Sequence, residues 1–434
     1  MDFADYKFDN RIPVIAETEV LVVGAGPGGV SAAVMAARQG VKTMIVERYG
    51  CPGGMAVFGE VTPMMYNLHF GKSLDKPCYV DWCRRMHNYK TSDELAKDPF
   101  TESVPYRPIS KAEATLAMEE LLLESNVKML YHHTLFDVIR NEGKITAALF
   151  LSKSGLVAVR AKVFVDSTGD GDLAVMAGAP FEFGNEDGYC QPMTTCFKLE
   201  HVQQDLMPTR EEITKIYNDA KASGEIVCPR ENVLFFTTPD DDVIHFNTTR
   251  IIKKSAVSGT ELSEAEIEGR RQIREFLAFL RKNIPGFKNA HLRSIAHHVG
   301  VRESRRILGI VYQTQDDFMN CAKFTDGIAK VNYCIDIHNP GGTGTKIVNL
   351  PPDEWYEIRY GTLVPRNTGN VLMGCRAISI DHALHSSCRV MPPVCSIGQA
   401  AGMAAAMCVE KNCSPAELQG EEVRKNLADA GAWL

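Results

Sequence analysis

The feature that most constrains the fold of this chain is a glycine-rich turn close to its beginning, between an apolar run and a stretch of small residues. Residues 20–23 (VLVV) are continuously apolar, which is typical of a buried parallel strand. Residues 24–29 (GAGPGG) match the pattern G-x-G-x-x-G, and residues 28–39 predict a helix. Residues 42–47 (KTMIVE) predict a second strand. Together they predict a β-α-β unit, in which a right-handed crossover places the strands side by side.

The three glycines of this pattern have separate roles in binding a dinucleotide. Gly24 permits the tight turn, Gly26 lets the backbone approach a pyrophosphate, and Gly29 lets helix and strand pack closely. The positive end of the helix then faces the phosphates. Glu47 ends the second strand, where its carboxylate can accept a hydrogen bond from a ribose hydroxyl and would repel a 2′-phosphate. The pattern therefore favours a dinucleotide site over a glycine turn without a ligand.

Three further segments indicate a ligand longer than NAD. Gly53 and Gly54 follow Glu47 closely, where a second backbone approach to an extended ligand would be needed. Residues 163–172 (VFVDSTGDGD) end a later strand with another such turn, and residues 389–392 (RVMP) precede a helix of small residues. NAD is normally held within one half of such a fold, whereas the flavin end of FAD needs contacts distant in sequence. We therefore predict FAD; the alternative is an NAD-dependent dehydrogenase without flavin.

These segments together resemble a known family. The motifs are Glu47 with Gly53-Gly54, residues 166–174 (DSTGDGDLA), residues 300–307 (GVRESRRI), and residues 389–392 with 398–402 (GQAAG). They are similar to the bacterial FAD-dependent oxidoreductases of the glutathione-reductase-like flavoprotein superfamily, from residue 19 to about 409. The resemblance implies non-covalent FAD in extended form and no particular substrate. The chain lacks the C-x-x-C of disulfide reductases and a second G-x-G-x-x-G between strand and helix, so dithiol exchange and a built-in NAD(P)H domain are not expected.

The predicted cofactor contacts come from the glycine loop, the segment after the second strand, the meander, the later strand and the C-terminal helix. They are Gly24, Gly26, Pro27, Gly28, Gly29, Glu47, Arg48, Gly53, Gly54, Met55, Val138, Thr168, Gly169, Asp170, Ile397 and Gly398. The C-terminal helix is expected from about residue 394 to 409, and its N-terminal end, near residues 396–398, should point at the flavin pyrimidine, where its positive end would stabilise the reduced ring. Its small residues could equally serve close packing, and both roles can hold together.

The predicted fold class is α/β: a glutathione-reductase-like FAD-binding Rossmann fold, with a parallel sheet and a β-meander, and an inserted α+β substrate domain. A chain of 434 residues is too long for one compact core. The meander is expected at residues 135–141, 144–152 and 156–162. The predicted domains are residues 1–180, the first part of the FAD-binding domain, with an insertion at 50–108 over the cofactor face; residues 181–325, the substrate or cap domain; and residues 326–434, the C-terminal part of the FAD-binding domain.

Hydride transfer usually needs a proton partner, and histidine is the natural one near neutral pH. Asp336 and His338 alternate as on a strand, so the carboxylate could orient the imidazole. His382 and His385 precede the RVMP segment and would share one helical face. We predict that at least one of these three histidines is catalytic. A third pair at 297–298 competes, and histidines that bind backbone carbonyls or face solvent remain the alternative.

Other reactive residues are weaker candidates. Arg302, Arg305 and Arg306 could bind an anionic substrate, although ion pairing within the fold is the favoured interpretation. A catalytic Cys51 would need an activating base, and the sequence identifies none. Covalent flavin attachment at His69 is less favoured still. No metal site is expected, because no cysteine cluster suits zinc or an iron–sulfur centre.

Composition limits the partners and the compartment. The net charge of −7 argues against a nucleic-acid or anionic-membrane partner. Thirteen cysteines without C-x-x-C, together with no signal peptide, favour the cytoplasm, and no stretch is expected to span a bilayer. The predicted function is hydride transfer between flavin and a small organic substrate, with the direction open. The alternative is an electron-transfer subunit that serves a partner protein. A homo-oligomer or a redox partner protein is compatible with either.

Overall fold

A five-stranded parallel sheet lies at the centre of the computed structural model, which describes residues 11–92, 109–238 and 240–434. In sheet order the strands are β21 (Val371–Met373), β10 (Val163–Asp166), β2 (Val20–Val23), β3 (Thr43–Val46) and β6 (Lys128–Leu130). Every residue of β2, β3 and β10 is buried, as continuous apolar runs require of strands covered on both faces. The predicted mixed α/β fold with a parallel sheet is confirmed. The expectations for residues 1–10 and for 93–108 of the insertion lie outside the described residues.

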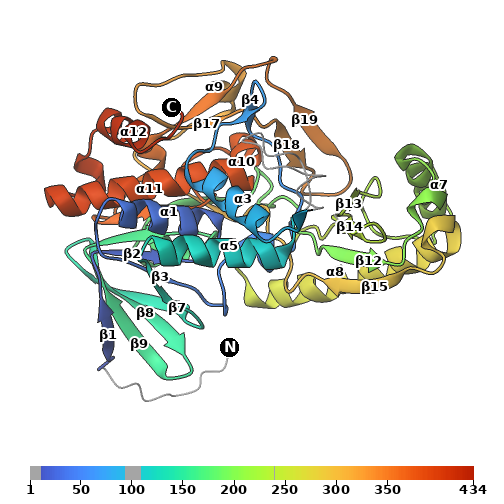
Figure 1. The fold of residues 1–434 in the computed structure, drawn as a ribbon, viewed down its shortest axis with the longest axis horizontal. Helices are drawn as coiled ribbons and strands as arrows, with labels where there is room; N and C mark the ends of the chain where they lie inside the picture. The colour runs from blue at the N-terminus through green and yellow to red at the C-terminus, as the bar shows by residue number, and fades with distance from the viewer. Residues whose placement is uncertain (1–10, 93–108, 239) are drawn as a thin grey trace.

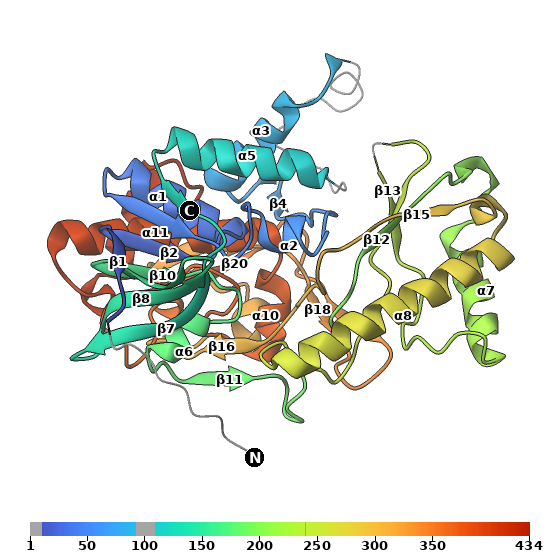
Figure 2. The same ribbon diagram turned by 90° about the horizontal axis from the view of Figure 1, so that it is seen from below.

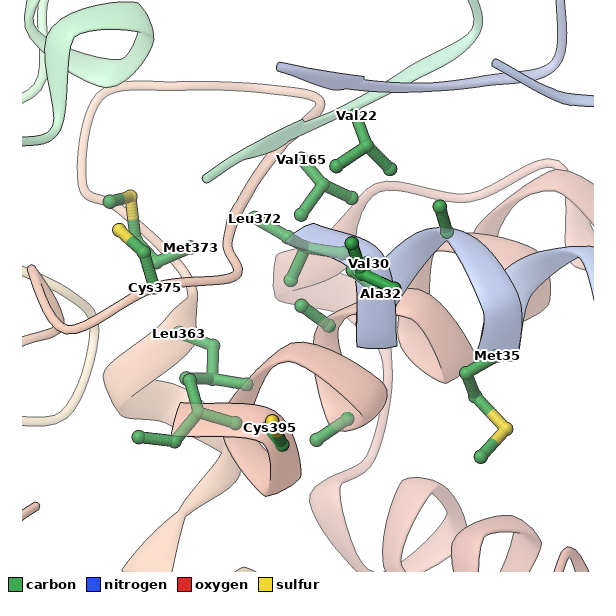
Figure 3. Close-up of a cluster of buried hydrophobic side chains, with 14 of the residues drawn as sticks. Val22, Val30, Ala32, Met35, Val165, Leu363, Leu372, Met373, Cys375 and Cys395 are labelled. Carbon is green, nitrogen blue, oxygen red and sulfur yellow. The ribbon is translucent and has the colours of Figure 1, made fainter. Parts of the chain in front are cut away.

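Helices cover one face of this sheet, with α1 and α11 lying side by side against it (Figure 1). The helices against the sheet are α1 (Pro27–Arg38), α5 (Lys111–Glu124) and α11 (Met391–Lys411), and α3 (Cys78–Asn88) packs on these three helices. Side chains of α1 such as Val30 meet Val22 and Val165 of the strands in the core (Figure 3). A methyl group on Gly398 would lie 2.0 Å from the carbonyl oxygen of Gly28, so only glycine lets these helices approach this closely.

The sequence analysis missed one property of α11. By length and composition this helix could cross a membrane, so the expectation that no stretch of the chain is long and apolar enough was wrong. However, 94% of its apolar window is buried inside the protein, between the sheet and the neighbouring helices. The composition is therefore explained by a central packing position, which a helix that is apolar all round also suits.

A β-meander packs beside the parallel sheet, as the sequence predicts. Its strands are β7 (Thr134–Asn141), β8 (Lys144–Ser152) and β9 (Gly155–Arg160), joined by β1 (Val14–Glu17), which pairs with β9 in parallel. The tight turns fall at Gly143 and Gly155, both with positive φ, which explains the hairpin signals at these positions.

A second, antiparallel sheet projects to one side of the molecule and carries its own hydrophobic cluster (Figures 1 and 2). Its strands, in order, are β13 (Phe235–Thr237), β14 (Ile244–Phe246), β12 (Phe197–Glu200) and β15 (His291–Ile295), with α7 (Arg210–Ala222) and α8 (Gly259–Asn283) beside them. Phe197 and Phe246 face the cluster. By strand alternation, Lys198 and its neighbour His245 point to the opposite face. We call this unit the cap.

Shorter elements complete the fold around the central sheet and the cap. The paired strands are β11 (Phe181–Phe183) with β16 (Arg305–Ile307), β17 (Gly327–Val331) with β20 (Tyr356–Arg359), β18 (Ile335–His338) with β19 (Thr345–Val348), and β4 (Leu68–His69) with β5 (Lys72–Ser73). The short helices are α2 (Gly54–Val57), α6 (Asp172–Met176), α9 (Gln315–Met319), α10 (His382–Cys388) and α12 (Gly420–Asp429). Single 3-10 turns occur at Gln204–Leu206, Pro285–Phe287, Tyr360–Leu363 and Pro415–Glu417.

The α1–α11 contact predicts a strong effect of a single methyl group. In Gly402→Ala the new Cβ would lie 2.1 Å from the carbonyl oxygen of Ala32, so the helices must separate. We expect a loss of about 1–3 kcal/mol in the free energy of unfolding, seen as a lower Tm in a thermal melt. Gly259→Ala is the matched control, because its Cβ would meet no atom within 4 Å. Equal melting of both variants would contradict the close contact.

Candidate functional site

A cavity lies where the carboxyl ends of all five parallel strands meet the N-terminus of α1. This is the position at which open α/β sheets bind ligands. It encloses about 1030 Å³, including space open to solvent. Its lining comes from the segments that follow β2, β3, β6, β10 and β21, together with α1, α2, the start of α11 and one residue of the cap, His298.

The glycine loop is shaped partly by the protein and partly for a ligand. A Cβ on Gly24 would lie 2.3 Å from the oxygen of Ser167, and one on Gly29 would lie 1.9 Å from the oxygen of Gly24. The fold itself therefore requires these two glycines. At Gly26 the nearest atom to an added Cβ is the Cα of Gly54, at 3.8 Å, so packing does not explain this glycine. The open space before it fits a pyrophosphate.

The N-terminus of α1 is prepared for an anion. Gly26 is its N-cap residue and supplies no side-chain hydrogen bond, so the first-turn amides of the helix face the cavity without a capping side chain. No acidic side chain lies in this first turn. Amides at a helix N-terminus bind phosphate groups well, because the helix dipole adds to their hydrogen bonds.

Glu47 lies at the edge of the same cavity and is only 6% exposed. Its Oε2 accepts a hydrogen bond of 2.7 Å from the backbone amide of Ala25, and its Oε1 accepts one of 3.0 Å from that of Tyr49. The carboxylate therefore braces the glycine loop. Each oxygen keeps a further lone pair, so the ribose hydrogen bond stays a prediction compatible with this arrangement.

Most of the predicted cofactor contacts line this cavity. They are Gly24, Gly26, Pro27, Gly28, Gly29, Glu47, Arg48, Gly54, Met55, Thr168 and Gly169. Three others, Gly53, Val138 and Asp170, lie outside the lining. The backbone amide of Gly53 donates a hydrogen bond of 2.8 Å to the oxygen of Ala25, and Val138 lies on the meander. Asp170 instead binds Arg376 at 2.7 Å, and this arginine does line the cavity. Asp170 thus acts on the cavity through a neighbour.

Ile397 and Gly398 also lie outside the lining, because α11 begins earlier than predicted. The helix starts at Met391, before the predicted start at about residue 394 and the predicted N-terminal end near 396–398, since Pro392 and Pro393 suit the first turn of a helix, where no amide partner is lost. The expected start was therefore wrong. Gly398 serves the packing against α1, and the first turn of α11 reaches the cavity through Met391 and Val394.

His298 is a cavity residue that the predicted site did not include. Its Nδ1 lies 2.8 Å from the carbonyl oxygen of Val299, so Nδ1 carries the hydrogen and Nε2 is an acceptor. That Nε2 is buried and has no hydrogen-bond partner among the described residues. The ring stacks on Tyr49 at 5.5 Å, and burial lowers the pKa of His298. A hydroxyl group of a bound ligand would satisfy this orphaned acceptor.

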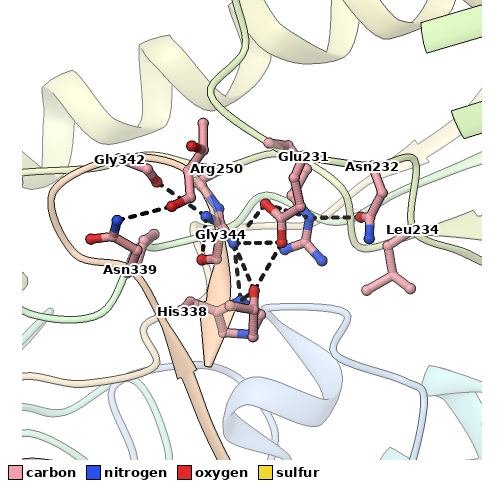
Figure 4. Close-up of polar contacts among 12 residues, drawn as sticks. Glu231, Asn232, Leu234, Arg250, His338, Asn339, Gly342 and Gly344 are labelled. Atoms are coloured by element: carbon pink, nitrogen blue, oxygen red, sulfur yellow. Dashed lines mark hydrogen bonds and ion pairs between the residues drawn. The ribbon is translucent and has the colours of Figure 1, made fainter. Parts of the chain in front are cut away.

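The three histidines predicted to be catalytic all lie outside the cavity lining. His338 does have the carboxylate neighbour that the sequence predicts, because its Nε2 lies 3.6 Å from Oδ2 of Asp336. Its Nδ1 lies 3.2 Å from Nη2 of Arg250 and 3.2 Å from Oγ1 of Thr345 (Figure 4). Burial and the charge of Arg302 lower the pKa of His338 to about 3, so the imidazole is neutral at physiological pH.

His382 and His385 share helix α10 but differ in surroundings. His382 Nδ1 lies 2.8 Å from Oε1 of Glu303, an oxygen that also binds Arg306 at 2.5 Å. His385 is fully buried, and neither ring nitrogen has a hydrogen-bond partner in the described part of the chain. Burial lowers the pKa of His385 well below its usual value, and the charge of Arg306 adds to this effect.

The arginines of the GVRESRRI segment divide into two kinds. Arg305 forms an ion pair of 2.7 Å with Asp172, and Arg306 pairs with Glu303, as the favoured structural interpretation expects. Arg302 differs, because its contacts are the oxygen of Pro192 at 2.7 Å and Oδ1 of Asn247 at 3.3 Å.

The remaining weak candidates lie away from the cavity. Burial raises the pKa of the Cys51 thiol, which disfavours a thiolate nucleophile, and Cys51 is not part of the lining. His69 packs against Trp355 at 4.8 Å, also outside the lining. Among the described residues, no group of three or more His, Cys, Asp or Glu side chains is arranged to hold a metal ion.

The geometry of the glycine loop predicts that folding and cofactor binding can be separated. In Gly26→Val the side chain enters the space before α1, where it meets little protein, so the variant should fold but lose FAD. Gly29→Ala should instead destabilise the fold, because its Cβ collides with the oxygen of Gly24. Chromatography of heat-released flavin and a thermal melt measure the two effects. Stoichiometric FAD in Gly26→Val would show that the loop does not hold the pyrophosphate.

Because His245 is buried and neutral, we predict that the free energy of unfolding falls as the pH becomes acidic. Burial lowers the pKa of His245 to about 3, whereas an unfolded histidine titrates near 6.5. Between these values the unfolded chain binds more protons, so stability is full above about pH 6.5 and is lost as pH falls below it. His245→Gln should therefore lose less Tm than wild type between about pH 7.5 and about pH 5.5. His201→Gln, at an exposed cap residue, is the control. Apoprotein is used, and equal losses in His245→Gln and wild type would contradict this assignment.

Comparison with known proteins agrees with this site. A family model described as FAD dependent oxidoreductase matches residues 19–427. The chain is similar to dihydrolipoyl dehydrogenase of Haemophilus influenzae, with 42% identity over 60 residues, 14% of this chain and 13% of that protein. It is similar to thiamine thiazole synthase of Methanococcus maripaludis, with 26% identity over 174 residues, 37% of this chain and 59% of that protein. The chain thus aligns with less than two thirds of either relative.

Among solved structures, the chain is similar to a geranylgeranyl bacteriochlorophyll reductase-like protein from Thermoplasma acidophilum, with a TM-score of 0.49 and 12% identity. That likeness covers 96% of this chain and 84% of the other. The family match spans the glycine loop, the cap and α11, and so includes every segment that lines the cavity. The chain therefore belongs to the FAD dependent oxidoreductase family, and its cofactor is FAD.

Proposed function

We propose that this protein transfers a hydride between FAD and a small organic substrate that binds between the cavity and the cap. One observation carries the proposal: Arg389 belongs both to the cavity and to a buried polar cluster beneath the cap. Its Nη2 lies 3.2 Å from the backbone oxygen of Asp336 and 3.3 Å from Oε1 of Gln191. A group held at this junction would reach bound cofactor and titratable side chains together.

The proposal includes the finer fold class and the division of the chain. We assign the fold to the glutathione-reductase-like class, with residues 1–180 and 326–434 as the FAD-binding domain and 181–325 as the substrate domain. The separate hydrophobic cluster of the cap supports this division. We further propose a cytoplasmic location, a small-molecule substrate, and no nucleic-acid or membrane partner. A homo-oligomer or a redox partner protein remains compatible with this function.

When bound, FAD supplies a two-electron acceptor or donor for hydride transfer. In the oxidative direction the substrate C–H bond breaks, and the hydrogen leaves with both bonding electrons. The neighbouring O–H or N–H group then gives its proton to a base of the protein, and the reductive direction reverses both transfers.

We propose that His338 is the group that accepts this proton in the oxidative direction and donates it in the reductive direction. Its ring is neutral, and Asp336 is positioned to stabilise the imidazolium that proton transfer would form. Because its pKa is lowered to about 3, His338 would accept a proton only after bound substrate offsets the neighbouring positive charge. Asp336 itself is anionic: although burial opposes this, contacts with His338 and the charge of Arg389 lower its pKa. His382 and His385 act instead through the packing of α10, just before the RVMP segment.

Histidine variants test this assignment by separating cofactor binding from chemistry. His338→Ala should keep its FAD, because His338 lies outside the cavity lining, but should slow flavin reduction by substrate at least about a hundredfold. His382→Ala and His385→Ala test the two alternative histidines, and His201→Ala is an exposed control. The measurement is the single-turnover rate of flavin bleaching, anaerobically, with a substrate found by screening a metabolite panel.

Two outcomes would contradict the proposal. Normal bleaching in His338→Ala would contradict its assignment, and normal bleaching in all three variants would place the proton transfer elsewhere, with Tyr66, His69 and the Arg302 region as the next candidates. If no small molecule reduces or reoxidises the flavin while a partner protein does, the protein is the electron-transfer subunit that the sequence left as the alternative.

A further inference from the structure

A cluster of buried and half-buried charged residues lies where the cap meets the β18–β19 hairpin. It holds four arginines and two carboxylates: Arg230, Arg250, Arg302, Arg389, Glu231 and Asp336. His338 lies among them and is neutral, so the cluster carries an excess of two positive charges. Buried charge without compensation is costly, which makes this excess a feature that requires an explanation.

Arg250 holds the cap to the hairpin, and Arg230 shares its carboxylate partner. Arg250 is 1% exposed, and its Nη1 donates to the backbone oxygens of Gly342 and Gly344, at 3.1 and 3.0 Å (Figure 4). Its Nη2 forms an ion pair of 3.1 Å with Glu231. Arg230 lies 4.0 Å from that same carboxylate. Glu231 is therefore shared by these two arginines.

Arg302 and Arg389 are left with one carboxylate between them. Arg389 lies 3.9 Å from Oδ2 of Asp336, and its closer contacts are neutral oxygens. In the described part of the chain, Arg302 forms no ion pair within 4.0 Å and donates only to neutral oxygens of Pro192 and Asn247. Burial and the neighbouring charge of Arg389 lower the pKa of Arg302, so the two guanidinium groups destabilise each other here.

An independent observation points to a missing acceptor at the same place. Gln191 is 1% exposed, and its Oε1 faces Nη2 of Arg389 at 3.3 Å and the amide of His338 at 3.4 Å. Its Nε2 is buried and has no hydrogen-bond partner among the described residues. Nε of Arg389 is in the same situation. Buried donors without acceptors are rare in native proteins, and a ligand oxygen would satisfy both.

We propose that Arg302, Arg389 and Gln191 bind a carboxylate group of the substrate, which makes the substrate a small organic acid. A planar carboxylate suits the guanidinium fork, which can donate two parallel hydrogen bonds to it. A monoanion also suits the site better than a phosphate dianion, because Asp336 lies beside Arg389 and repels added negative charge. The inference rests on the proposed function, since it names the substrate class of that site.

Binding of a carboxylate would also prepare His338 for its role. The charges of Arg302 and Arg389 both lower the pKa of His338, whereas Asp336 raises it. A bound anion would offset the two arginine charges, and the imidazole would then accept a proton more readily. Proton transfer would thus depend on the presence of the correct anionic substrate.

The test uses the FAD-loaded protein with acetate and propionate as probes. Flavin absorbance and Tm are followed during titration, with chloride at matched ionic strength as the reference. We expect saturable spectral change and a raised Tm with a carboxylate. Arg302→Met should raise the Kd about tenfold or more, since a charge-assisted hydrogen bond is lost. Arg302→Lys should give a smaller rise, because lysine keeps the charge but not the fork.

Arg293→Met is the matched control, because Arg293 is an exposed arginine of the same cap sheet and pairs with Asp240. It should bind both probes as wild type does. If Arg302→Met does not fold, the Kd of Arg302→Lys and the wild-type titration test the inference in its place. Absence of saturable binding in wild type, preference for inorganic phosphate, or an unchanged Kd in a folded Arg302→Met would overturn the inference. These failures leave FAD content and flavin reduction intact, whereas failure of the proposed function removes one or both.

Discussion

The contact between α1 and α11 is the constraint on which the rest of this structure depends. It joins a helix from the beginning of the chain to one from its end, and it is possible only because Gly398 and Gly402 present bare backbone to the carbonyls of α1. A separation of even one methyl group would move the start of α11 away from the glycine loop. The cavity exists because segments more than three hundred residues apart are held in register by this packing.

Electrostatics shapes the other side of the site. Beneath the cap lie buried and half-buried arginines that the protein itself only partly neutralises, next to a histidine that burial and their charge keep neutral. Such an arrangement costs stability, and proteins retain it where a ligand supplies the balancing charge. In the proposed site the family's cofactor fills the cavity, and the charge excess lies where a substrate would meet it. The two proposed halves of the site would therefore have different physical origins: backbone geometry for FAD and largely buried charge for the substrate.

Local patterns made much of this predictable. The β-α-β unit, the glycine loop and the meander follow from apolar periodicity, turn residues and strand lengths, all of which act over short distances. Long-range packing was not predictable in the same way. From the sequence, Gly398 was predicted to contact the flavin. In the structure, a Cβ at this position would lie 2.0 Å from the carbonyl oxygen of Gly28 in α1, which explains the glycine by packing. His298 and Arg302 gain their roles from the cap, whose docking leaves no local signature in the sequence.

The central claim is that one cavity holds the dinucleotide at the α1 N-terminus and presents its flavin to the cluster beneath the cap. A crystal structure of the purified protein with its bound cofactor tests this most directly. The account predicts density for the pyrophosphate in front of Gly26, and a flavin ring that lies between the start of α11 and Arg389. A flavin bound elsewhere, or a cavity occupied by side chains rather than by the cofactor, would contradict it.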